Sequence, residues 1–104
     1  MVGLSGDGLR FLDDMWDNFR KRLPDSVLGI FDNLRSDVFE HMAIGFGVAV
    51  ERKSSWLKND MLMILADLVS NKMSETKDKL VIRELKTIRD IAVKRVLEQL
   101  KNRL

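Results

Sequence analysis

Apolar side chains recur every three or four residues along most of the chain, which is the spacing of amphipathic helices. The pattern predicts four helices, over about residues 7–22, 26–50, 55–71 and 75–103. Pro24 separates the first two, and short charged or hydroxyl-rich stretches separate the others. The sequence therefore predicts an all-α fold, either a four-helix bundle or a helical hairpin array with a long C-terminal helix.

Two segments carry apolar side chains on every face of the expected helix, residues 42–50 and 61–66. A helix that is apolar all round is expected to be buried all round. Two glycines weaken a regular helix over the first segment, and a short strand is the alternative. Because the chain offers no second strand for it to pair with, we expect a helix there.

The apolar stripe of the last predicted helix changes direction partway along. Its first half presents Val81, Leu85, Ile88 and Ala92 on one face, and its second half presents Val93, Leu97, Leu100 and Leu104 on another, about 100° away. Two interpretations remain open: the second half contacts another subunit, or the helix kinks near Ala92.

Composition limits the kinds of protein that remain. A chain of 104 residues with 45% hydrophobic residues is expected to form a single helical domain over 1–104. The absence of cysteine excludes disulfides, thiolate metal sites and thiol catalysis. No apolar run is long enough to span a membrane, and no signal-peptide pattern opens the chain, so we expect a cytoplasmic or intracellular protein.

Charge is unevenly distributed along the chain, although the net charge is only +2. Residues 74–104 contain nine basic and five acidic residues, whereas residues 25–52 contain two and five. Four of the basic residues fall on one face of the last helix: Lys79, Arg83, Lys86 and Lys94. They would suit phosphate contacts on a nucleic acid, or they simply form the solvated back of an amphipathic helix.

Candidate chemistry is sparse. Asp37 lies one helical turn before His41, the only histidine, and this pair is either a partial metal site or a half-buried histidine hydrogen-bonded to Asp37. We expect the latter. Gly3, Gly6 and Gly8 precede a helix but lack the strand and lysine of a phosphate-binding loop, so they are expected to form a flexible lead-in. No metal, cofactor or enzymatic activity is predicted.

The sequence therefore favours a small non-enzymatic structural or interaction protein that self-associates through its apolar hairpin and its C-terminal helix. Small residues four apart, as at Gly45 and Ala49, let a second helix approach closely. The expected interface consists of Gly45, Ala49, Val93, Leu97, Leu100 and Leu104. The alternative is a nucleic-acid-binding or packaging protein that uses the basic face of the last helix.

Overall fold

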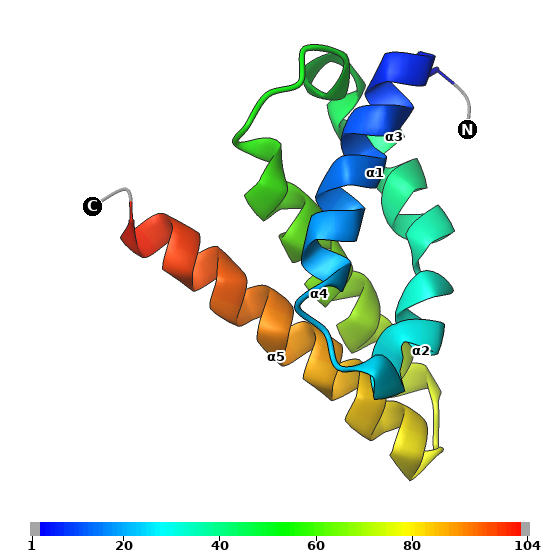
Figure 1. Ribbon diagram of the computed structural model, residues 1–104. Helices are drawn as coiled ribbons and strands as arrows, with labels where there is room; N and C mark the ends of the chain where they lie inside the picture. The colour runs from blue at the N-terminus through cyan, green and yellow to red at the C-terminus, as the bar shows by residue number, and fades with distance from the viewer. Residues whose placement is uncertain (1–2, 103–104) are drawn as a thin grey trace.

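The computed structural model describes residues 3–102 and is built from helices and connecting turns throughout that range, which confirms the all-α prediction (Figure 1). Its elements are α1 (Gly6–Arg20), the 3-10 turn η1 (Asp25–Val27), α2 (Leu28–Asp32), α3 (Arg35–Glu51), α4 (Leu57–Glu75) and α5 (Lys79–Lys101). No described helix is both long and apolar enough to cross a bilayer.

The continuous helix expected over 26–50 is instead divided into η1, α2 and α3. The break has a packing reason. Trp16 of α1 stacks on Phe31 at 4.0 Å between ring centroids and meets Phe39 edge-on at 5.8 Å. In one regular helix Phe31 and Phe39 would lie about 12 Å apart along the axis, and the turn before Arg35 brings both rings onto one indole.

The expectation that residues 42–50 are buried on all sides is wrong. Ile44 and Val48 expose 79% and 69% of their surface. The same segment is kinked at Phe46, whose φ of −136° and ψ of 25° lie outside the helical region. Beyond the kink Val50 is the residue that enters the core. The second all-apolar segment departs from the expectation as well, because Met63 is 52% exposed.

The glycine-containing lead-in is helical from Gly6 onward rather than irregular to residue 8. Ser5 caps α1, and its hydroxyl accepts a hydrogen bond from the Gly8 N–H at 3.1 Å. The Ser5 N–H donates to Glu51 Oε1 at 2.7 Å, and the Ser5 hydroxyl donates to the other oxygen of the same carboxylate. The last residue of α3 thereby holds the first turn of α1.

Helices α4 and α5 form the most extensive helix pair and lie antiparallel across a short turn (Figure 1). Asp78 caps α5 by accepting hydrogen bonds from the Leu80 and Val81 N–H groups. Helix α5 runs unbroken from Lys79 to Lys101, so the possible kink near Ala92 is absent. Its C-terminal half extends beyond the other helices at the left of Figure 1.

Candidate interaction surfaces

The C-terminal half of α3 and the turn after it form a shallow apolar depression, which we call the α3 hollow. Its volume is about 650 Å³, and it is lined by Ala43, Ile44, Gly45, Phe46, Gly47, Val48, Ala49, Arg52, Ser54 and Trp56. The two glycines have open space where a side chain would stand. They leave bare backbone between the projecting side chains of Ile44 and Val48.

The turn that ends α3 forms one end of the α3 hollow. Lys53 adopts a positive φ of 54°, while the Ser54 N–H donates to the Ala49 carbonyl and the Lys53 N–H to that of Val50. These two bonds define a Schellman motif, which reverses the chain at a helix C-terminus. The reversal brings Trp56 edge-on to Phe46 at 6.2 Å, with 46% of the indole residue exposed.

A second apolar surface, the α5 ridge, consists of Val93, Leu97 and Leu100, which are 37%, 61% and 47% exposed. Ala92 and Val96 on the adjoining face of the same helix are buried in the core. The change of direction seen in the sequence is therefore a division between a core face and an outward face. Leu104, the fourth expected interface residue on this helix, lies outside the described residues.

The structure does not bring together all the residues of the expected interface. Gly45 is exposed and Ala49 half-buried, and both line the α3 hollow. In Figure 1 this end of α3 lies at the top of the bundle, apart from the projecting half of α5 that carries the α5 ridge. The sequence analysis did not single out Trp56, because this residue lies at the start of the predicted helix over 55–71 and is not part of a periodic apolar stripe.

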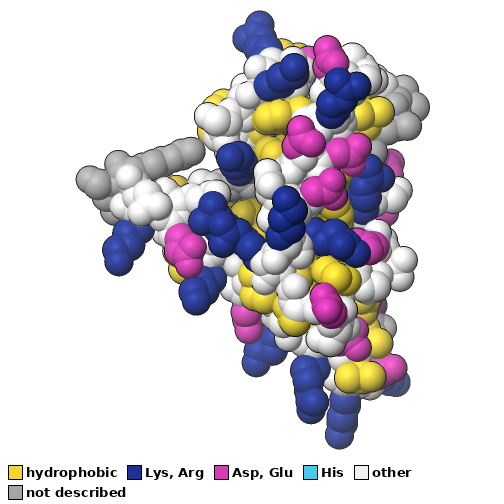
Figure 2. All heavy atoms as spheres, viewed as in Figure 1, with side chains coloured by type: hydrophobic (Ala, Val, Ile, Leu, Met, Phe, Trp, Pro, Cys, Tyr) yellow, Lys and Arg dark blue, Asp and Glu magenta, His cyan; other side chains and the backbone are white. Residues whose placement is uncertain are grey.

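The four basic residues expected on one face of α5 are all exposed: Lys79, Arg83, Lys86 and Lys94. In Figure 2, dark-blue side chains project along the edge of the molecule that α5 forms. Asp90 lies among them at helical spacing and is 3.5 Å from Arg89 Nε. At about 100° per residue, Lys86 and Leu97 point in nearly the same direction. Three of the four basic residues lie in the first half of α5, and Lys94 lies in the second half, which also carries exposed apolar residues.

The expected histidine arrangement differs in detail. His41 is exposed rather than half-buried, and its Nδ1 lies 2.7 Å from the backbone carbonyl oxygen of Asp37. The Asp37 carboxylate instead faces Lys72, at 3.9 Å from Nζ. Within residues 3–102, no group of three or more potential ligands is placed to hold a metal ion.

Two carboxylates have perturbed acidity, and both connect helices. Hydrogen bonds from the Ser5 hydroxyl and backbone N–H hold the pKa of Glu51 below its usual value. The pKa of Asp32 is lowered by the guanidinium of Arg20, which donates to both carboxylate oxygens at 2.9 and 3.0 Å. Both contacts link separate helices, Ser5 at the start of α1 to Glu51 of α3 and Arg20 of α1 to Asp32 of α2.

Comparison with protein-family models, with curated proteins and with solved structures finds no match for this chain.

Proposed function

We propose that this protein is a non-enzymatic interaction protein that self-associates, with the α5 ridge of one copy seated in the α3 hollow of another. One observation carries the proposal. Of eight large hydrophobic residues that are exposed within residues 3–102, three belong to the α3 hollow and three to the α5 ridge. Scattered exposed hydrophobic residues are ordinary on a monomer, whereas clusters of this kind mark interaction sites.

The chemistry of the two surfaces supports a second copy as the partner. Both are formed by uncharged side chains, apart from Arg52 at the border of the α3 hollow. The ridge is a row of aliphatic side chains on a helix, and the hollow contains two glycines that let a helix approach closely. Each copy carries both surfaces, so its α5 ridge can pack into the α3 hollow of a second copy.

The symmetry of the pairing follows from the two surfaces being different. Two copies can exchange ridge and hollow twice across a two-fold axis, or each copy can contact the next once, giving a ring or an open chain. Because the chain contains no cysteine, such contacts rely on apolar packing rather than on disulfides. The same lack of disulfides supports an intracellular location.

The strength of the ridge contact can be worked from exposed fractions. Burying a fully exposed leucine contributes about 1.5–3 kcal/mol, so the exposed 61% of Leu97 and 47% of Leu100 contribute about 2–3 kcal/mol together. Replacing both by glutamine therefore weakens association about 30- to 150-fold. Leu80→Gln is the matched control, because Leu80 is equally exposed, at 61%, on the same helix but at its other end.

A mixing experiment tests the pairing itself. The ridge variant (Leu97→Gln with Leu100→Gln) keeps its hollow, and the hollow variant (Ile44→Gln with Val48→Gln) keeps its ridge. Each variant alone is expected to sediment as a monomer, whereas an equimolar mixture is expected to form a one-to-one dimer. Each mixed pair retains one intact ridge and one intact hollow, so a mixture that remains monomeric at every accessible concentration would contradict the ridge-in-hollow pairing.

The second candidate is nucleic-acid binding through the basic face of α5, favoured by the exposure of all four of its basic residues, Lys79, Arg83, Lys86 and Lys94. Such binding is electrostatic, so it weakens with salt with a log–log slope of about −0.9 for each phosphate contacted on B-DNA. Replacing Lys79 and Lys86 by glutamine would then make the slope shallower by about two. Duplex DNA that does not bind the full chain at low salt would eliminate this candidate.

A further inference from the structure

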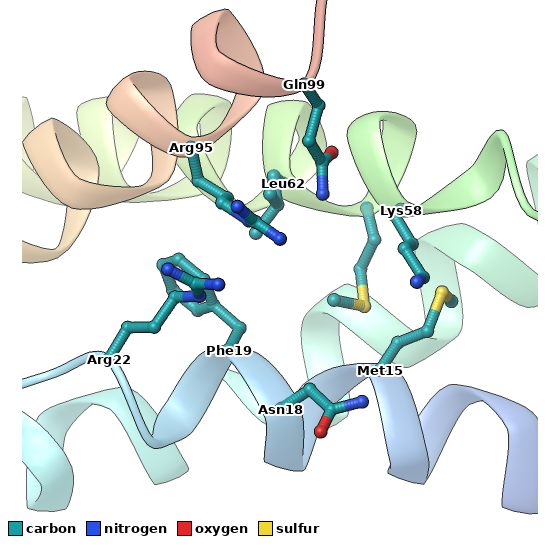
Figure 3. A pocket seen from close by; sticks show the side chains of 9 residues that line it. Met15, Asn18, Phe19, Arg22, Lys58, Leu62, Arg95 and Gln99 are labelled. Carbon is teal, nitrogen blue, oxygen red and sulfur yellow. The ribbon is translucent and has the colours of Figure 1, made fainter. Parts of the chain in front are cut away.

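A separate pocket of about 200 Å³ lies where α1 and the turn after it face α4 and the C-terminal half of α5 (Figure 3). Its lining consists of Met15, Asn18, Phe19, Arg22, Lys58, Met61, Leu62, Arg95 and Gln99. In Figure 3, Arg95 and Gln99 reach into it from α5, while Met15 and Phe19 face them from α1. We call it the basic pocket.

The rim of the basic pocket carries charge of one sign. Arg22, Lys58 and Arg95 come from three different parts of the fold, and no carboxylate is among the lining residues. Arg95 is partly neutralised by Glu98, 3.5 Å away, which lies outside the lining. Three cations gathered at one opening repel one another, and a bound anion relieves that repulsion.

The floor of the basic pocket is apolar. Four of its lining side chains belong to the hydrophobic core and are buried: Met15, Phe19, Met61 and Leu62. The pocket therefore combines an apolar floor, a cationic rim and two neutral amides, those of Asn18 and Gln99. Ligand sites commonly have this composition, with apolar walls and a few polar groups that fix orientation.

We infer that the basic pocket binds a small organic anion, with an aromatic or similarly compact apolar body on the floor and a phosphate, sulfonate or carboxylate group at the rim. Arginine guanidinium groups suit such oxyanions, because they donate parallel hydrogen bonds to two oxygens. A volume of about 200 Å³ is below the about 300–1,000 Å³ of sites for drug-sized molecules, so the ligand is of fragment size. None of the pocket residues belongs to the α5 ridge or the α3 hollow, so this inference does not depend on self-association.

Phenyl phosphate is a suitable probe, because it carries both parts of the inferred ligand. The full chain, labelled with ¹⁵N, is titrated with phenyl phosphate, with benzyl alcohol and with inorganic phosphate while amide shifts are recorded. The expected result is saturable shifts on α1, α4 and the second half of α5, with phenyl phosphate binding at least about tenfold more tightly than either of the others. Binding of phenyl phosphate no tighter than that of benzyl alcohol, or shifts spread over the surface, would overturn the inference.

Charge variants assign the binding to the rim. Lys58→Gln and Arg95→Gln are each expected to weaken phenyl phosphate binding about five- to tenfold, since each removes a cation that contacts the anionic group. Lys94→Gln is the control, because it removes the same charge from the neighbouring position on α5, outside the pocket. An equal loss of affinity in Lys94→Gln would show general electrostatic attraction and overturn the assigned site. Preserved amide dispersion in each variant verifies that the fold is retained.

Discussion

Replacing Gly8 by alanine tests the junction between the start of α1 and the end of α3. A β-carbon at position 8 would lie 2.6 Å from Glu51 Oε1, closer than real contacts come, and 3.1 Å from its carboxyl carbon, which is tight. Glu51 is a flexible side chain on the surface, so it is the group that would move. Moving it breaks the hydrogen bonds between Ser5 and the carboxylate.

Two opposing effects set the size of the change. Alanine in place of a helical glycine stabilises a protein by about 0.5–1 kcal/mol when nothing obstructs it, which raises Tm by about 2–8 °C in a domain of this size. In the unmodified chain this gain is offset by the displacement of Glu51. In the Glu51→Ala background the obstacle and its hydrogen bonds are already gone, so the full gain is expected.

The assay is therefore a double-mutant cycle of Gly8→Ala and Glu51→Ala, followed by thermal unfolding and by urea titration. All four proteins are compared at one concentration, because Tm depends on concentration for any chain that self-associates. Gly8→Ala is expected to raise Tm by about 2–8 °C only when Glu51 is absent. An equal rise in both backgrounds would refute the contact between Gly8 and Glu51.

Three further changes test other parts of the fold. Lys53→Gly is expected to stabilise the protein by about 0.5–1 kcal/mol in urea titration, because Lys53 has a φ of 54°, where a β-carbon is disfavoured; a destabilisation would contradict the Schellman turn. Phe31→Ala is expected to lower the free energy of unfolding by about 3–5 kcal/mol, because the ring is fully buried against Trp16; a loss below about 1 kcal/mol would be inconsistent with that stack. Arg20 lowers the pKa of Asp32, so the stability from this pair is present above the unfolded pKa of Asp32 and is lost as pH falls through the lower folded pKa. Below about pH 4, Tm is therefore expected to fall more steeply in the unmodified chain than in Asp32→Asn, and identical pH profiles would contradict the pairing.

Where a helix has one apolar face, the sequence predicted both the helix and the side that packs into the core. On α1 the spacing of Leu12, Trp16 and Phe19 predicted the residues that are buried. On α5 the change of stripe left two interpretations open, a contact with another subunit or a kink near Ala92; the helix is unbroken, and Val93 and Leu97 are exposed. The spacing of apolar residues along the sequence predicts burial because the side of a helix on which a residue lies depends on its angle around the helix axis.

The breaks in the second predicted helix could not be read from periodicity. The turn before Arg35 exists because Phe31 and Phe39 share the indole of Trp16, a contact between residues far apart in sequence. At the kink, Phe46 packs edge-on against Trp56, and the flanking Gly45 and Gly47 are the two residues that the sequence marked as weakening a regular helix there. Tertiary contacts of this kind override local helix preference.

Sites formed by residues from several helices could not be predicted from the sequence either. The basic pocket joins Arg22, Lys58 and Arg95, and no spacing rule relates residues on three separate elements. The Ser5–Glu51 connection has the same character, although the serine three residues before Gly8 is a common helix-cap position. By contrast, the residues of the α5 ridge lie on one helix, and helical spacing alone assigned them to one surface.

Self-association is tested most directly by the mass of the full chain in solution, measured by light scattering over a range of concentrations. We expect a mass above the 12.0 kDa of one chain, rising toward a whole multiple of it, for the unmodified protein and for Leu80→Gln. The variant with Leu97→Gln and Leu100→Gln is expected to stay at 12.0 kDa over the same range. An unmodified chain that remains at 12.0 kDa at every concentration, or an assembly that the ridge variant leaves unchanged, would contradict the proposed function.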